Sequence, residues 1–360
     1  MNVARLKPPD TLHTEGNIMR QKSIRRTITS IVMGLAASSM TAGLVVAQDV
    51  TVRFATLQSP RHELSVEMQK AFDRIAEETD GRVEFQVHYG SESGFSAKQY
   101  VSALEQGMFD GALIATSASA LEYPWLGVYG LPFLAPDEAA RQDMLAATEP
   151  MLETFSKEHR IVPLAYPLHP DRWLVIYSSR DIETVEDFEG MLIRTYDPNT
   201  NTIAASLGAV PTSLQKSEIY MGLQRGTVDG AITGITAAEE MKFDEVVEHI
   251  FQLDVMFLPH ILGLSEKVWA QLGSEDQETV RRVFDEWEED FVAKHADSGR
   301  AEDPYAYAKS KGMNIIVPEE SIEAVFEEIH KNAVDEFIAK DEASAKAYEA
   351  IIEARESHLN

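Results

Sequence analysis

Residues 171–240 read DRWLVIYSSRDIETVEDFEGMLIRTYDPNTNTIAASLGAVPTSLQKSEIYMGLQRGTVDGAITGITAAEE. Three short apolar runs in this stretch have the character of strands: 173–178, 191–195 and 228–232. Helix-like segments lie between them. Asp197-Pro198 has the pattern of a helix N-cap followed by proline at the first helical position, and it predicts a helix through Leu207. Strands that alternate with helices indicate an α/β unit with a largely parallel sheet.

Arg194 is the only charged residue in the run 191–195. An arginine in a short apolar strand costs free energy unless it meets an anion. A carboxylate of this acidic chain and a bound ligand would both satisfy it, and the spacing alone favours neither.

The alternation continues toward the N-terminus. Residues 50–55 and 83–89 alternate apolar and polar side chains as half-buried strands do, and residues 63–79 have the apolar face of a helix. Residues 111–115 are typical of a short buried strand. Much of the chain therefore reads as α/β.

The C-terminal region is different, because its pattern is helical throughout residues 275–296, 321–339 and 343–355. Neither an internal repeat nor a long Pro/Gly/Ser linker is evident. Two lobes would therefore have to be joined by several short crossings of the chain.

Composition excludes several classes of function. The 360 residues carry a net charge of −27, which argues against nucleic acid as a partner. The absence of cysteine removes disulfides, zinc–thiolate sites, iron–sulfur clusters and cysteine nucleophiles. Motifs for dinucleotides, nucleotide phosphates, zinc, calcium and a serine nucleophile are also missing. We therefore expect no cofactor and no metal.

The first 47 residues have the layout of an export signal. A basic cluster at residues 20–26 precedes the uncharged run 27–46, and Val45 and Ala47 are small residues before a cleavage point at Gln48. A membrane anchor is the alternative, but the many Ser, Thr, Gly and Ala residues make the run only mildly apolar. We expect a signal peptide and a soluble periplasmic product.

Several motifs together resemble one family. TVEDFEGMLIR (184–194) and LGAVPTSLQKSEIYMGLQRGTVDGA (207–231) resemble two signatures of the DctP-type substrate-binding proteins of tripartite ATP-independent periplasmic (TRAP) transporters. Shorter similarities follow the same order along the chain: DGRVEFQVHYGSESG (80–94), LEQGMFDGALIAT (104–116) and YGLPFL (129–134). The resemblance spans roughly residues 50–270.

The resemblance implies a two-lobed periplasmic-binding-protein fold of the α/β class, with mixed sheets, multiple crossovers between the lobes and a helical C-terminal region. Residues 1–47 are then an upstream extension and signal peptide. Lobe I comprises 48–169 plus about 259–298, and lobe II comprises 170–258 plus about 299–360. The implied function is an extracytoplasmic receptor, expected to be a monomer, that captures a small organic acid anion in a closing cleft and delivers it to TRAP membrane permease subunits.

The resemblance also implies site residues. Arg194 matches the family arginine that makes a bidentate salt bridge to the ligand carboxylate, and Arg172 matches a second arginine at the start of the preceding strand. Thr233 stands where sialic-acid-binding members have asparagine, and Lys216 stands where many members have an aromatic residue. Further wall candidates are Trp173 and Tyr196 beside the arginines, Gln58 and His62 after the first strand, and Thr116 and Ser117 after the strand 111–115.

The residues leave two other functions open. One is a secreted α/β enzyme that uses a carboxylate pair, although no nucleophile–base constellation is evident. The other is a binding protein for a different importer or for a sensor. The sequence identifies neither the carboxylate, nor a second anionic group on the ligand, nor a co-bound cation.

Overall fold

The structure is a computed structural model that describes residues 49–135, 138–167, 174–253, 259–301, 305–318 and 323–359. The predicted signal segment 1–47 and two candidate site residues, Arg172 and Trp173, lie outside the described residues. No helix within these described ranges has the length and apolar character needed to cross a bilayer.

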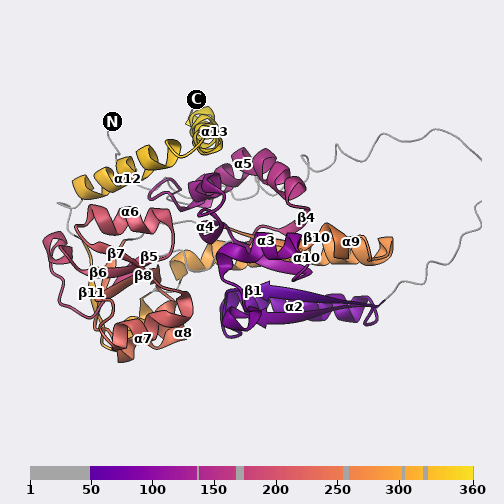
Figure 1. Cartoon of the computed structure of the whole chain (residues 1–360), viewed down its shortest axis with the longest axis horizontal. Helices are drawn as coiled ribbons and strands as arrows, with labels where there is room; N and C mark the ends of the chain where they lie inside the picture. Colours follow the sequence, from indigo (N-terminus) through magenta and orange to yellow (C-terminus); the bar gives the residue numbers. More distant parts are fainter. Residues whose placement is uncertain are drawn as a thin grey trace, which may run out of the picture. The chain divides into compact units, whose positions relative to one another are not determined.

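The first sheet has the strand order β2-β1-β3-β10-β4. Figure 1 labels β1, β10 and β4 of this sheet. Its strands are β1 (Val50–Thr56), β2 (Val83–Tyr89), β3 (Gly111–Ala115), β4 (Ile161–Ala165) and β10 (His260–Ser265). Strand β1 runs parallel to β2 and β3, whereas β10 runs antiparallel to β3 and β4. The chain therefore returns to this mixed sheet with β10 after it has built most of the second one.

The second sheet has the order β11-β9-β5-β8-β6-β7. Its strands are β5 (Leu174–Ser178), β6 (Leu192–Thr195), β7 (Val210–Ser213), β8 (Gly230–Gly234), β9 (His249–Gln252) and β11 (Asn314–Ile316). Strands β6, β7 and β8 are parallel, and β5 is antiparallel to β8 and β9. We call the part built on the first sheet lobe I and the part built on the second sheet lobe II.

Helices cover both faces of each sheet. The α-helices are α2 (Glu63–Glu78), α3 (Tyr100–Glu105), α4 (Thr116–Ser119), α5 (Glu138–Glu158), α6 (Pro198–Ser206), α7 (Ile219–Gln224), α8 (Ala237–Met241), α9 (Glu266–Trp269), α10 (Ser274–Ala301), α11 (Ala306–Ser310), α12 (Glu323–Ile338) and α13 (Glu342–Leu359). The 3-10 segments are η1 (Gly90–Ser93), η2 (Ala97–Gln99), η3 (Pro124–Gly130), η4 (Val185–Phe188), η5 (Lys216–Glu218) and η6 (Phe243–Glu245).

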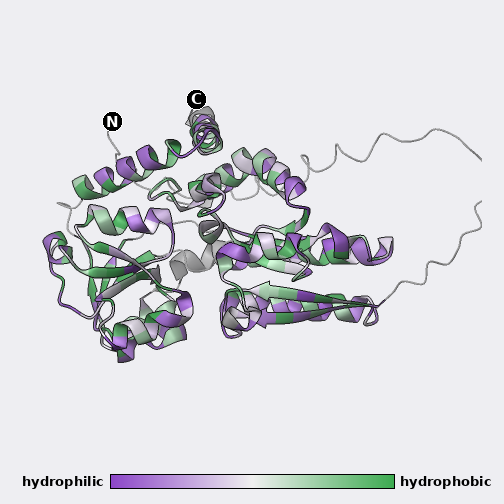
Figure 2. Cartoon of the chain, viewed as in Figure 1, coloured by the Kyte–Doolittle hydropathy of each residue, from purple (hydrophilic) through white to green (hydrophobic). Residues whose placement is uncertain are grey.

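The sheet of lobe II has apolar side chains on both faces, and helices pack against each face. Alternate residues of β5 enter different cores: Ile176 packs with α6 and α12, and Tyr177 packs with α7 and α8. Figure 1 shows α6 on one side of this sheet and α7 and α8 on the other. The strands of this sheet are largely hydrophobic, whereas α12 shows both hydrophilic and hydrophobic residues (Figure 2). A strand buried on both faces reads as a continuous apolar run, as the sequence does here.

The helix predicted after Asp197-Pro198 is confirmed, and its cap is well defined. Asp197 accepts a hydrogen bond from the Thr200 amide at 2.7 Å, and Pro198 occupies the first helical turn of α6. The side chain thereby satisfies one of the amides that a helix start leaves without a partner. This cap fixes the path of the chain directly after Arg194.

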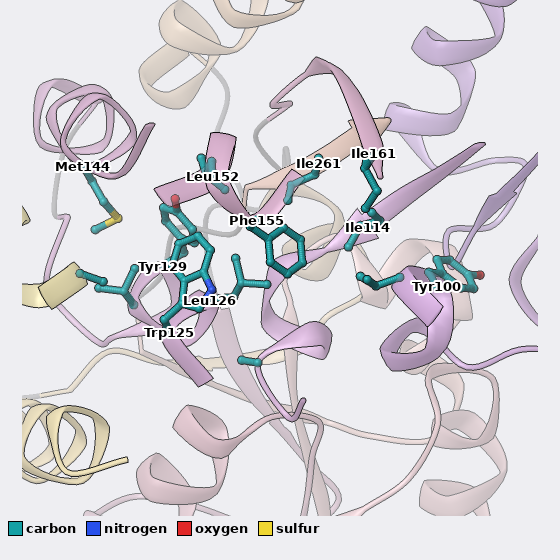
Figure 3. Close-up of a cluster of buried hydrophobic side chains, with 14 of the residues drawn as sticks. Tyr100, Ile114, Trp125, Leu126, Tyr129, Met144, Leu152, Phe155, Ile161 and Ile261 are labelled. Atoms are coloured by element: carbon teal, nitrogen blue, oxygen red, sulfur yellow. The ribbon is translucent and has the colours of Figure 1, made fainter. Parts of the chain in front are cut away.

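Lobe I has a large aromatic core between its sheet and the helices α5 and α13. Figure 3 shows Trp125 and Tyr129 of η3 close to Phe155 and Leu152 of α5. Ile351 of α13 is fully buried in the same cluster. The last helix therefore packs on elements of lobe I, whereas the predicted division assigns residues 299–360 to lobe II. The predicted lobe boundaries stay a proposal.

A local unit occurs once in each lobe, although the sequence analysis finds no internal repeat. LEQGMFDGALIA (104–115) and LQRGTVDGAITG (223–234) each lead from a short helix through a left-handed glycine into a buried strand. Asp110 binds the Arg53 amide and guanidinium, and Asp229 accepts from the Leu192 amide at 2.9 Å. Each aspartate therefore ties its turn to a neighbouring strand.

The α/β class with mixed sheets, predicted from the sequence, is confirmed. The strands at 50–55, 83–89 and 111–115 correspond to β1, β2 and β3. The helical character of the C-terminal region is confirmed by α10, α12 and α13.

Candidate functional site

The candidate residues lie at the same kind of place in both lobes, namely the C-terminal ends of parallel strands. In lobe I, Gln58 and His62 follow β1, and Thr116 and Ser117 follow β3. In lobe II, Arg194 and Tyr196 lie at the end of β6, Lys216 follows β7, and Thr233 lies near the end of β8. Parallel strands present their carboxyl ends at one edge of the sheet, where α/β proteins bind ligands.

Arg194 is held by the backbone of the two neighbouring strands. Its Nε donates to the Leu214 carbonyl at 3.0 Å, and its Nη1 donates to the Ile232 carbonyl at 3.1 Å. The side chain is only 5% exposed. These contacts fix the plane of the guanidinium before any ligand arrives.

The Arg194 guanidinium has more N–H donors than its two backbone hydrogen bonds use. An arginine carries five N–H donors, and two of them bind the carbonyls. Among the residues that the structure describes, no carboxylate forms an ion pair with Arg194, and its Nη2 makes no hydrogen bond to them. Burial lowers the pKa of Arg194 to about 10, so the group is still a cation at neutral pH.

Tyr196 supplies an apolar wall beside this cation. The Arg194 Cζ lies 5.0 Å from the centroid of the Tyr196 ring, within the range of a cation–π interaction. The ring also packs against the core of lobe II that includes α6. A buried cation with an aromatic face on one side and free donors on another is suited to a planar anion.

Asp197, three residues after Arg194 in the sequence, is an acid whose charge interacts with that arginine. Its side chain is buried and its Oδ1 accepts hydrogen bonds from the amide and hydroxyl of Thr200. Burial raises the pKa of Asp197 to about 6, although the Thr200 hydrogen bonds and the charge of Arg194 act in the opposite direction. The carboxyl is thus committed to the α6 cap rather than to an ion pair with Arg194.

Four polar residues from both lobes form a second group, which we call the interlobe cluster: Gln58, His62, Lys216 and Glu240. Lys216 Nζ lies 2.9 Å from Gln58 Oε1 and 3.4 Å from Glu240 Oε2. Glu240 Oε1 lies 3.5 Å from His62 Nε2. Lys216 and Glu240 belong to lobe II and the other two to lobe I, so the cluster joins the lobes.

His62 of this cluster also caps a helix. Its Nδ1 accepts a hydrogen bond from the Leu64 amide at 3.2 Å and so caps helix α2. With Nδ1 as the acceptor, the neutral ring carries its hydrogen on Nε2, the atom that faces Glu240. The ring is buried and its orientation is set by the helix start.

The structure brings together only some of the predicted residues. Arg194 contacts Tyr196, and Lys216 contacts Gln58 and reaches His62 through Glu240. The Thr116 hydroxyl donates to the Pro259 carbonyl at 2.7 Å and serves lobe I itself. Ser117 and Thr233 are buried, and among the described residues neither forms a hydrogen bond with the interlobe cluster.

Sequence reasoning missed Glu240 and the two carbonyls that hold Arg194. Glu240 is one of 59 acidic residues, and no local pattern distinguishes it from the others. Within the described residues, no group of three or more His, Asp or Glu side chains is arranged to hold a metal ion. A surface pocket between α5 and α13 is lined by different residues, including Ala147, Met151 and Ala343.

The chain is similar to known proteins along most of its length. The model of the DctP family, described as bacterial extracellular solute-binding protein, family 7, matches residues 54–341. A solute-binding protein of Roseobacter denitrificans is 24% identical over 314 residues, which cover 84% of this chain and 93% of the relative.

Solved structures show the same fold. The DctP7 receptor of Bordetella pertussis, described as binding pyroglutamic acid, is 19% identical with a TM-score of 0.77, over 84% of this chain and 99% of that one. A TRAP periplasmic solute-binding protein of Desulfovibrio salexigens with bound orotic acid is 22% identical with a TM-score of 0.74, over 86% and 98%. The two-lobed fold expected from the motifs is confirmed by this similarity.

Proposed function

Because the chain belongs to family 7 of the bacterial extracellular solute-binding proteins, we propose that it is an exported receptor for a small organic carboxylate. The carboxylate would be enclosed between lobes I and II and handed to a TRAP-type membrane permease. Members of this family bind solutes and are not enzymes. Export by the signal segment 1–47 and a periplasmic location belong to the same proposal.

The observation that carries the proposal is the state of Arg194. A guanidinium that is 5% exposed and has no carboxylate partner among the described residues costs desolvation energy that two carbonyls and a ring offset only in part. A ligand carboxylate would complete its coordination. Since Nε is occupied by Leu214, the carboxylate would bind end-on, through Nη1 and Nη2.

The partner lobe would supply the rest of the site. Ligand can favour the closed form only if it contacts both lobes, because only then does its affinity differ between open and closed states. Gln58 and His62 of lobe I already meet Lys216 and Glu240 of lobe II. We propose that residues at this junction also touch the ligand that Arg194 holds.

The relatives with solved structures suggest the class of ligand. They contain pyroglutamate, orotate and sugar acids such as gulonate, all small organic acids. We infer that the ligand of this receptor is also a small acid with polar groups beyond its carboxylate. Arg172, Trp173, Thr233, Thr116 and Ser117 stay candidates for further contacts.

A titration tests the proposal. The purified protein is mixed with a panel of organic acids, and binding is followed by calorimetry and by the fluorescence of its four tryptophans. We expect at least one acid to bind, and Arg194→Ala to weaken that binding by about 2–5 kcal/mol, the range for removing one partner of a buried charge pair. Arg225→Ala, an exposed arginine of lobe II, serves as the control and should bind normally.

Two results would contradict this account. A protein that binds none of the acids is not a carboxylate receptor. Wild-type affinity in the folded Arg194→Ala variant would show that another residue holds the ligand.

A further inference from the structure

We infer that Glu240 is a specificity-determining residue that reserves the site for acids with a single carboxylate. It does so by neutralising Lys216, a second cation beside the site. This inference rests on the proposed function and names the charge class of its ligand.

Lys216 is linked to Arg194 through the backbone of a neighbouring residue, Leu214. The Leu214 carbonyl accepts a hydrogen bond from Arg194 Nε, and Leu214 is two residues before Lys216. The Cα atoms of Leu214 and Lys216 are therefore at most about 7.6 Å apart, the length of two Cα–Cα steps. Glu240 belongs to α8, which follows β8, and the Ile232 carbonyl of β8 binds Arg194 Nη1. The same two strands therefore set the positions of Arg194 and of the Lys216–Glu240 pair.

An unpaired lysine at this place would attract the second carboxylate of a dicarboxylic acid. Lys216 is instead engaged by Glu240 Oε2 at 3.4 Å and by Gln58 Oε1 at 2.9 Å. Both side chains of the pair are mostly shielded from solvent, with 27% exposure for Lys216 and 14% for Glu240. Low exposure reduces screening by water and salt and makes the neutralisation effective.

A dicarboxylate would meet two penalties here. Its second carboxylate would have to share Lys216 with Glu240, and it would face the like charge of Glu240 at short range. Specificity of this kind comes from a repulsive element directed against the wrong ligand rather than from added contacts to the right one. A neutral hydroxyl, carbonyl or amide of a monocarboxylate meets neither penalty.

The test compares acids that differ by one carboxylate, such as lactate with malate and gluconate with glucarate. The affinities for both acids of a pair are measured with wild type and with Glu240→Gln. If another acid of the panel binds, it is compared in the same way with its analogue that has one added carboxylate. We expect wild type to prefer the monocarboxylate, and Glu240→Gln to shift the ratio of affinities toward the dicarboxylate by about tenfold or more. Glu239→Gln removes the same charge from an exposed position of α8 and should leave the ratio unchanged.

A second variant should move the ratio in the other direction. Lys216→Met removes the ammonium group that Glu240 Oε2 engages, so discrimination against dicarboxylates should increase. In the double variant Glu240→Gln/Lys216→Met the gain for dicarboxylates should disappear, because that gain depends on the released ammonium group.

The inference is wrong if wild type binds the dicarboxylate of a pair as tightly as the monocarboxylate, or if Glu240→Gln, shown to be folded by circular dichroism, does not change the ratio. The proposed function survives both results, since the protein still binds an acid. Failure of wild type to bind any acid contradicts the proposed function itself.

Discussion

Asp197 should give the protein a recognisable pH dependence of stability. Its pKa is about 6 in the folded protein and near 3.8 when it is unfolded. Between these values the folded state holds a proton that the unfolded state has released, so stability falls as the pH rises from about 4 to 6. The two-unit difference corresponds to roughly 2–3 kcal/mol, and above pH 6 the loss is complete.

The variant Asp197→Asn tests this expectation. Asparagine keeps the N-cap of α6 but has no charge to bury. Relative to wild type, the variant should gain stability as the pH rises from 4 to 7, measured by urea denaturation at each pH. Asp290→Asn, an exposed residue of α10, is the control. A constant difference between Asp197→Asn and wild type at all pH values would contradict the buried, protonated carboxyl.

At the scale of residues, the sequence indicated the arginine but not its surroundings. Arg194 is visible as the lone charge of an apolar run, whereas its own spacing left a structural ion pair and a ligand equally open. The carbonyls of Leu214 and Ile232 that hold it come from positions 20 and 38 residues away. Glu240 has no local signal, because its role depends on Lys216 and His62 being brought to it by the fold.

At the scale of elements, both Asp-Gly turns should be sensitive to an added side chain. A Cβ on Gly111 would lie 2.6 Å from Leu264 Cδ2 and 2.8 Å from Phe54 Cδ2, and one on Gly230 would lie 2.5 Å from the Tyr177 carbonyl oxygen. We expect Gly111→Ala and Gly230→Ala each to cost about 1–3 kcal/mol by thermal or urea denaturation. Gly230→Ala should cost more, because its shortest contact would be a clash between the added Cβ and a backbone oxygen rather than a side chain.

Gly127→Ala is the matched control for these two variants. Its Cβ would meet only side-chain atoms, at 3.4 Å or more, and should cost less. Equal stability of wild type and Gly230→Ala would show that β8 does not pack against β5 as described.

Helix α13 offers a second prediction for an element. Ile351 is fully buried against the aromatic core of lobe I, so Ile351→Ala should destabilise the protein by about 2–5 kcal/mol. Ile338→Ala, at a position that is 38% exposed, should have an effect within about 0.5 kcal/mol. Similar denaturation midpoints for the two variants would mean that α13 does not belong to this core.

The elements themselves were largely predictable, because period-two and helical patterns, Asp197-Pro198 and the turn glycines are local signals. The correspondence of 104–115 with 223–234 was missed, since its members share turn residues but few side chains at the other positions. The packing of α13 on lobe I was also not predictable, because an amphipathic helix does not indicate which face of which lobe will cover it.

At the scale of the whole molecule, the topology of the two sheets supports placing the proposed site where the lobes meet. The chain builds most of the first sheet, then most of the second, and returns with β10 and β11. Candidate residues of both lobes follow parallel strands and are therefore carried to corresponding edges. This arrangement was anticipated only through the family resemblance, since local patterns do not specify which strands share a sheet.

The most direct test is a crystal structure of the protein purified without refolding, so that an acid acquired in the cell is retained. The account predicts a carboxylate placed end-on against Nη1 and Nη2 of Arg194, with other atoms of the same molecule in contact with lobe I. An Arg194 that is paired with one of the protein's own carboxylates, while a retained molecule binds elsewhere, would contradict it.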